Sequence, residues 1–193
     1  MEEIDESFEY PEFNPAHKRT LDDIAAWVRN FNELPIYFLN GPAEKGKTLV
    51  VKTIIRELRR SKQLTVSFFC SRTYDSNMIP ALAIQLAEKV PRFRSNLVRV
   101  LQPNQPIRFP GQNIVAQMGE FIFNPLRESG IKNMVIVIDG LDKYEGEGNQ
   151  AILSCLKTVE SEIGEANMKF LITSRPMPEI QATFPDCMHS LTF

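Results

Sequence analysis

Residues 36–48 read IYFLNGPAEKGKT, an apolar run followed by Gly41, four residues, and then Gly46, Lys47 and Thr48. This is the pattern G-x-x-x-x-G-K-[ST] of a phosphate-binding loop, placed directly after a predicted strand and directly before a predicted helix. In that setting, consecutive backbone N–H groups surround phosphate oxygens, and the helix N-terminus adds partial positive charge. The segment therefore predicts that the chain binds a nucleoside triphosphate.

The residue types of this loop carry distinct chemical roles. Lys47 is expected to reach the β- and γ-phosphates, where it would also act in catalysis, and the Thr48 hydroxyl is expected to ligate Mg²⁺. The residues predicted to hold the nucleotide are Gly41, Pro42, Ala43, Glu44, Lys45, Gly46, Lys47, Thr48 and Leu49.

The composition fits one soluble domain. The chain has 193 residues, 43% of them hydrophobic, and a net charge of −2, which gives no electrostatic argument for nucleic acid or an anionic membrane. No run approaches the roughly 18 apolar residues that span a bilayer. The acidic N-terminus lacks the pattern of a secretory signal. We therefore expect a cytoplasmic protein with no membrane span and no nucleic-acid partner.

The cysteines and histidines form no recognisable site in the sequence. Cys70, Cys155 and Cys187 are odd in number and lack the C-x-x-C spacing, so neither a disulfide framework nor a zinc site is indicated. Cys70 and Cys155 lie in apolar patterns and are predicted core residues. His17 and His189 have no partner pattern, and we expect surface or structural roles for both.

An acidic segment opens the chain. Residues 1–18 are rich in acidic side chains and contain two prolines, a composition typical of a solvated tail or an extended arm. Thr20 followed by Asp23 resembles a capping box that begins a helix. The division predicted from these features is a tail at 1–18 and one folded domain at 19–193.

Strands alternate with helices over the rest of the chain. Apolar runs predict strands at 36–39, 64–70, 134–138 and 170–173, with a fifth near 191–193. Apolar residues at helical spacing predict helices directly after the loop and then at 78–90, 93–101, 113–127 and 149–163, with a Pro-rich connector at 102–112. This alternation indicates an α/β fold with a doubly wound, mainly parallel sheet.

A metal partner for the loop is predicted at the end of the third strand. Four apolar residues lead into Asp139-Gly140-Leu141-Asp142, and the strand places Asp139 at the carboxyl edge of the sheet, where open α/β folds bind ligands. There Asp139 would hold Mg²⁺ together with Thr48, and Asp142 would orient or deprotonate the attacking water. The alternative is that the segment is only a strand end and a turn, since Asp and Gly favour turns.

The fourth strand ends in a polar triplet that includes Arg175. A guanidinium group there would point at a γ-phosphate from the same sheet edge, and its planar fork can bond two phosphate oxygens at once. An ordinary surface arginine at a strand end is the alternative. Arg72, just after the second strand, is a further candidate for such a contact.

The combined pattern resembles a known family. The segments IYFLNGPAEKGKT, VSFFCSR, VIVIDGLDKY and MKFLITSRPMPEI are similar to the NACHT-type, nephrocystin-like N-terminal NTPase domains of fungal STAND proteins, from about residue 17 to 185. The resemblance implies a P-loop NTPase three-layer sandwich with sheet order 5-1-4-3-2 and helices on both faces. It places Lys47, Asp139 and Arg175 on adjacent strand ends. It also implies ATP or ADP as ligand, Mg²⁺, slow hydrolysis, and a signalling switch with a protein partner or self-association.

Three departures qualify this resemblance. Glu44 stands where family loops usually have Gly, at a cost of about 1 kcal/mol if the backbone there is left-handed. Lys143 follows Asp142 where the family usually has Glu, and the loss of a general base removes typically about 10²–10⁴-fold of rate. Family members usually continue into winged-helix and repeat regions, so we expect a stand-alone module or a fragment. Weakened binding and impaired hydrolysis are therefore expected.

Several functions stay open at this point. The first is a slow ATPase switch, and the second is a nucleotide-binding module without turnover. A small-molecule kinase also uses a phosphate loop, and an interaction domain with a vestigial loop is the fourth alternative. The guanine signature N-K-x-D is absent, which favours adenine nucleotides.

Overall fold

Five parallel strands form one central sheet. The computed structural model describes residues 15–30, 32–43, 46–71, 78–101, 114–143, 147–162 and 168–191. In this part of the chain the strands are β1 (Ile36–Asn40), β2 (Leu64–Phe69), β3 (Met134–Asp139), β4 (Met168–Ser174) and β5 (Met188–Ser190). Their order is β2-β3-β4-β1-β5, and every pair is parallel. Read from the other edge, this is the predicted order 5-1-4-3-2, which is confirmed.

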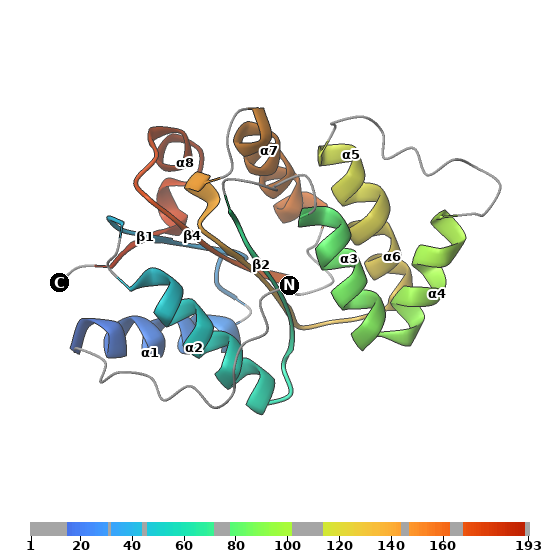
Figure 1. Ribbon diagram of the computed structural model, residues 1–193, viewed down its shortest axis with the longest axis horizontal. Helices are drawn as coiled ribbons and strands as arrows, with labels where there is room; N and C mark the ends of the chain where they lie inside the picture. The colour runs from blue at the N-terminus through green and yellow to red at the C-terminus, as the bar shows by residue number, and fades with distance from the viewer. Residues whose placement is uncertain are drawn as a thin grey trace.

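Helices cover both faces of the sheet, so the predicted three-layer sandwich is confirmed. One face carries α1 (Pro15–Arg29) and α2 (Lys47–Arg60), which pack together in Figure 1. The other face carries α3 (Met78–Lys89), α4 (Pro91–Val100), α5 (Ile114–Met118), the π-helix η2 (Gly119–Phe123), α6 (Asn124–Ser129), α7 (Glu147–Glu162) and α8 (Pro178–Thr183). The described residues also form two short 3₁₀-helices, η3 (Leu141–Lys143) and η4 (Pro185–Cys187).

Strand β3, which lies between β2 and β4, shows why the apolar runs predicted the strands correctly. Its side chains alternate between the two layers, so that Val135 and Val137 pack with α1 and α2 while Ile136 and Ile138 pack with the opposite helices. Because both faces are covered, every residue of β3 is buried. A strand in this position is an uninterrupted apolar run.

Helix α1 begins at Pro15, and the capping box predicted at Thr20 is wrong. Proline suits the first helical position because its missing N–H would be unpaired there in any case. The Thr20 hydroxyl donates to the backbone oxygen of Ala16 at 3.0 Å, a bond back into the preceding helical turn. Residues 1–14 lie outside the described part of the chain.

The fifth strand lies three residues earlier than predicted. Met188, His189 and Ser190 pair with β1, and the Leu191 N–H continues the ladder by donating to Asn40 O at 2.8 Å. Thr192 and Phe193, predicted to belong to this strand, lie outside the described residues.

The helix predicted over 113–127 is interrupted by a π-helical turn. Pro125 lies four residues after Phe121, and in an α-helix the proline would remove a hydrogen bond and its ring would press on that carbonyl. The wider turn of η2 precedes it instead, and the Asn124 N–H donates to Gly119 O five residues back. The 102–112 connector lies outside the described residues.

A buried lysine fixes the C-terminal end of α1 to β4. Lys169 is only 2% exposed, and its Nζ donates to the backbone oxygens of Trp27 at 2.5 Å and Asn30 at 2.8 Å. The same Nζ lies 4.4 Å from the centroid of the Trp27 ring. Cations near the last carbonyls of a helix also interact favourably with its dipole.

The cysteine prediction is confirmed for the two thiols that it named. Cys70 and Cys155 are both buried in the larger core cluster, and Cys187 is buried there as well. Burial raises the pKa of the Cys155 thiol to about 12. A thiol with such a pKa stays protonated and unreactive at neutral pH.

Candidate functional site

The phosphate-binding loop joins β1 to α2 at the carboxyl edge of the sheet. Gly46, directly before α2, has a φ angle of 81°, a left-handed conformation that favours glycine. A β-carbon at Gly46 would also lie 2.6 Å from Nε2 of His17 on α1. The left-handed backbone therefore favours glycine here, and a larger residue would also displace the His17 ring. Glu44 and Lys45 lie outside the described residues, and the departure at Glu44 stays untested.

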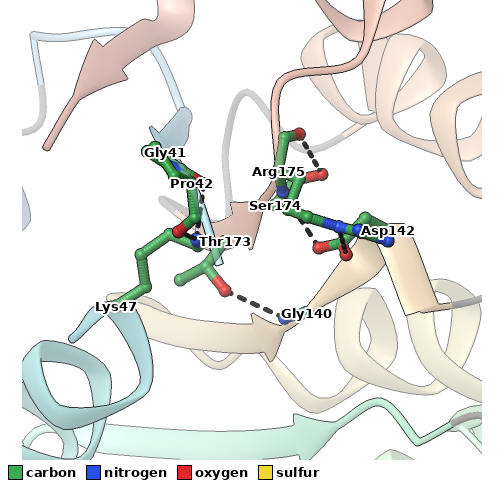
Figure 2. A network of polar contacts seen from close by, with 8 residues as sticks. All are labelled: Gly41, Pro42, Lys47, Gly140, Asp142, Thr173, Ser174 and Arg175. Atoms are coloured by element: carbon green, nitrogen blue, oxygen red, sulfur yellow. Dashed lines mark hydrogen bonds and ion pairs between the residues drawn. The ribbon is translucent and has the colours of Figure 1, made fainter. Parts of the chain in front are cut away.

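The Lys47 side chain is folded back over its own loop. Its Nζ donates to the backbone oxygens of Gly41 at 2.5 Å and Pro42 at 2.6 Å (Figure 2). Burial lowers the pKa of Lys47, while the nearby carboxylates of Asp142 and Asp139 act in the opposite direction. The ammonium group thus rests on two carbonyl acceptors, which phosphate oxygens of a ligand can replace.

The two residues predicted to hold the metal are in direct contact. The Thr48 hydroxyl donates to Oδ2 of Asp139 at 2.7 Å, although the residues are 91 positions apart in the sequence. Thr48 is exposed at the start of α2, whereas Asp139 is buried at the end of β3. The contact arises because the loop follows β1 and both strands end at the same sheet edge.

Thr173 is a site residue for which the sequence analysis gave no separate role. Its hydroxyl donates to Oδ1 of Asp139 at 2.6 Å and accepts the Gly140 N–H at 2.9 Å. Ile138 of β3 pairs with Ile172 of β4, so the next residues along, Asp139 and Thr173, lie side by side. The sequence did offer a sign of this role. The expected sheet order places the fourth strand next to the third, so a polar residue at its end would lie beside Asp139.

Asp142 and Arg175 bind each other. The Arg175 Nε donates to Asp142 Oδ2 at 2.6 Å, and the Arg175 backbone N–H donates to Oδ1 at 2.9 Å (Figure 2). Burial raises the pKa of Asp142, but the hydrogen bonds and the charge of Arg175 outweigh it, so the pKa lies below its ordinary value. The sequence predicted separate roles for the two residues and did not predict this ion pair.

Lys143 lies back over the end of β3. Gly140 has a φ angle of 79°, which turns the chain into η3, and the Lys143 N–H donates to Gly140 O at 2.9 Å. The distal Lys143 atoms Cδ, Cε and Nζ each lie 3.2 Å from the place where a β-carbon on Gly140 would be. The end of this exposed side chain therefore lies along the backbone next to Asp139.

The second histidine has a structural setting, in line with the expectation for it. His189 stacks on Tyr37 with ring centroids 3.7 Å apart and planes 5° apart. Burial lowers the pKa of His189, and the charges of Asp23 and Glu33 act in the opposite direction.

The predicted site residues that the structure describes gather at one sheet edge. Lys47 and Thr48 come from the start of α2, Asp139 and Asp142 follow β3, and Arg175 follows β4. Arg72 lies outside the described residues, so its candidate role stays untested. In the described part of the chain, no helix has the length and apolar character needed to cross a bilayer.

Three solved structures share this arrangement over nearly the whole chain. Cdc6p from Pyrobaculum aerophilum matches with a TM-score of 0.57 and 13% identity, covering 98% of this chain and 48% of that one. PCH-2 from C. elegans gives 0.54 and 16%, covering 98% and 45%. Drosophila ORC, solved bound to DNA, gives 0.54 and 14%, covering 97% and 45%. At such low identity the likeness shows the fold alone.

One curated relative is similar in sequence. The vegetative incompatibility protein HET-E-1 from Podospora anserina is 27% identical over 154 residues. The match covers 76% of this chain but only 11% of HET-E-1. The chain therefore spans about a tenth of that relative's length.

A family assignment covers the site. Residues 19–175 match the sequence profile of the family described as Nephrocystin 3, N-terminal. The matched range runs from the middle of α1 to Arg175 and includes the phosphate loop and Asp139. The resemblance predicted from the sequence is confirmed. The chain belongs to the Nephrocystin 3 N-terminal family.

Proposed function

We propose that this chain is the nucleotide-binding domain of a STAND-type signalling switch that takes ATP or ADP together with Mg²⁺. The observation that carries the proposal is the 2.7 Å hydrogen bond between Thr48 and Asp139, beside Lys47 on the loop. In P-loop NTPases a hydroxyl and a carboxylate from these two elements hold the metal, while the loop lysine contacts the phosphates. Family membership and the fold support the same assignment.

The available ligand atoms fit Mg²⁺. Thr48 and Asp139 offer hard oxygen atoms, and Mg²⁺ in nucleotide sites uses one or two protein ligands, phosphate oxygens and several waters. Thr173 keeps the Asp139 carboxylate oriented, as outer hydrogen-bond partners commonly do for metal ligands. Bound Mg²⁺ would neutralise charge on the phosphate oxygens. Nucleotide is therefore expected to bind more tightly with Mg²⁺ than without it.

We propose further that hydrolysis is slow. Asp142, the predicted base, uses both oxygens to bind Arg175, and its lowered pKa makes it a weaker proton acceptor. Lys143 occupies the position where the family resemblance implies a glutamate. The same observations favour the second candidate function, a nucleotide-binding module that works without turnover.

Calorimetric titration with Mg-ATP, Mg-ADP and Mg-GTP tests the binding proposal. Wild-type protein is expected to bind the two adenine nucleotides more tightly than GTP, and Lys47→Ala is expected to weaken binding by at least about tenfold, since it removes a charge-assisted bond. Lys157→Ala, on the exposed side of α7, is the matched control. No binding by the wild type at millimolar nucleotide would contradict the proposal and favour an interaction domain with a vestigial loop.

Single-turnover hydrolysis on the same samples separates the two candidate functions. Phosphate release in wild type that Lys47→Ala abolishes supports the slow switch. Tight binding with no phosphate release over hours supports the module without turnover. Transfer of phosphate to a screened acceptor would instead support a kinase.

The proposed cellular role is taken from the relative HET-E-1. A relative named for vegetative incompatibility suggests signalling in self/non-self recognition, through a protein partner or self-association in the cytoplasm. The division into an arm at 1–18 and a domain at 19–193 belongs to the same proposal, although α1 begins at Pro15 and so includes the last four residues of that arm. The expectation that no nucleic acid binds belongs to it as well.

A further inference from the structure

The proposed function assigns Lys143 no contact with the nucleotide or the metal. Its side chain is exposed, yet its three distal atoms occupy the space beside Gly140, each 3.2 Å from where a β-carbon on that glycine would be. Gly140 follows Asp139 directly and donates its N–H to Thr173, the residue that orients that carboxylate. The end of the lysine side chain thus lies beside the residue that directly follows the predicted metal ligand.

The surroundings of Gly140 define which part of a nucleotide would meet this ammonium group. Figure 2 draws Gly140 between the phosphate loop with Lys47 and the Asp142–Arg175 pair. A phosphate-binding loop surrounds the inner phosphates and its lysine reaches the β- and γ-phosphates. In the proposed function, the terminal phosphate would then extend past Lys47 towards Gly140 and Arg175. A cation over Gly140 therefore lies on the side of the terminal phosphate.

The charges at this sheet edge are not balanced in the described residues. Lys47, Lys143 and Arg175 carry positive charge, against the two carboxylates of Asp139 and Asp142. Asp142 is already paired with Arg175, and Lys143 lies beside Gly140 at the same sheet edge as Lys47. The surplus positive charge of Lys143 is therefore available to an additional phosphate.

We propose that Lys143 is a specificity residue that favours a nucleoside triphosphate over the diphosphate, by adding a third cation beside the terminal phosphate. This inference rests on the proposed nucleotide-binding function and adds the preference of the same site. The lysine that replaces the family glutamate then strengthens retention of the triphosphate, which is what a switch with slow turnover requires.

Titration of wild type and variants with a non-hydrolysable ATP analogue and with ADP, both with Mg²⁺, tests this role. Lys143→Ala is expected to weaken binding of the triphosphate by about tenfold and of ADP by less than about threefold, since one charge-assisted contact is lost only with the former. Lys143→Arg keeps the charge and should keep the preference. Lys132→Ala is the matched control, because this exposed lysine lies at the opposite, amino-terminal end of β3.

Each result decides a separate point. A triphosphate preference that disappears in Lys143→Ala and persists in Lys143→Arg and Lys132→Ala supports the proposal. Equal losses for both nucleotides, or no loss, overturn it while leaving the nucleotide-binding function intact. Failure of the wild type to bind either nucleotide overturns the proposed function, and this inference with it.

Discussion

At the scale of single residues, the hydroxyl of Thr173 fixes the geometry of the site. It is fully buried, donates to Asp139 and accepts from Gly140, so both the carboxylate and the following backbone N–H depend on it. The predicted metal ligand therefore reaches the loop in one orientation. The side chain acts through Asp139, which makes Thr173 a positioning residue.

Replacement of Thr173 by valine tests this role, because valine keeps the shape and removes the hydroxyl. Two buried polar groups lose their partner, at a cost of roughly 1–3 kcal/mol in the free energy of unfolding. We expect affinity for Mg-ATP to fall by about tenfold, with little change for ATP in EDTA. Calorimetry under both conditions measures the difference. Thr173→Ser is the control, and an equal loss with and without Mg²⁺ would point to general disruption of the fold.

The Asp142–Arg175 pair leads to a second expectation at this scale. If Asp142 serves to hold Arg175, Asp142→Ala should weaken ATP binding as much as Arg175→Ala does, and the double variant should add little. If Asp142 is instead the general base, Asp142→Ala should keep its affinity and lose about 10²–10⁴-fold in hydrolysis. Binding titrations and single-turnover rates on the three variants distinguish these outcomes.

At the scale of elements, one lysine of β4 adds polar contacts to the apolar packing of α1 on the sheet. Lys169 donates to the carbonyls of Trp27 and Asn30 at the end of this helix and lies over the Trp27 ring. A lysine in an otherwise apolar strand gave no sign of this role in the sequence. The helix end and the strand are brought together only by the tertiary fold.

Lys169→Met is expected to loosen this contact. Methionine fills similar space but removes the charged donor from both carbonyls, which keep only the backbone hydrogen bonds from Asn30 N–H to Trp27 O and from Glu33 N–H to Asn30 O, each 3.2 Å long. The loss of the ammonium group should lower the free energy of unfolding by roughly 1–3 kcal/mol. Trp27 is the single tryptophan of the chain, so its fluorescence reports on this end of α1 directly. We expect a red-shifted emission and earlier unfolding in urea, with exposed Lys132→Met as control. Unchanged emission would show that Lys169 does not secure the helix.

Helices and strands were predictable from the sequence where a single local pattern, such as an apolar run, determines the structure. The buried strands β3 and β4 are continuous apolar runs, and their parallel pairing brings Asp139 to the edge where Thr48 lies. The start of α1 was not predictable, because the pattern at Thr20 occurs inside a helix where the hydroxyl bonds backwards. The same applies to the Asp142–Arg175 pair, which joins positions 33 residues apart through geometry alone.

At the scale of the whole molecule, the sheet order determines where the chemistry is located. β1 lies between β4 and β5, so the loop after β1 faces the polar ends of β4 and β3 on one side. On the other side, His189 of β5 stacks on Tyr37 of β1. The family resemblance supplied this order; the apolar runs alone would have allowed others.

Tyr37 contributes a loss of stability at alkaline pH. This side chain is buried, and burial raises its pKa above the ordinary value of 10.0. The folded state keeps the phenolic proton where the unfolded chain loses it, so the contribution is complete below about pH 10 and is lost as the pH rises further. Urea unfolding at pH 8 and pH 10.5 should show a smaller alkaline loss for Tyr37→Phe than for wild type. Parallel losses in both proteins would contradict this account.

The contact between His17 and Gly46 has a mechanical consequence. Lys169 secures the C-terminal end of α1 near the start of β4, and the N-terminal end of the helix lies against the phosphate loop. The helix therefore runs from the amino-terminal ends of the strands to their carboxyl ends. Fifteen helical residues span about 22 Å as a stiff rod. The imidazole occupies the space that a β-carbon on Gly46 would need, so a displacement of the loop towards α1 meets the His17 side chain first. Helix α1 thus joins the carboxyl end of the sheet, where the phosphate loop lies, to the amino-terminal end as one stiff element.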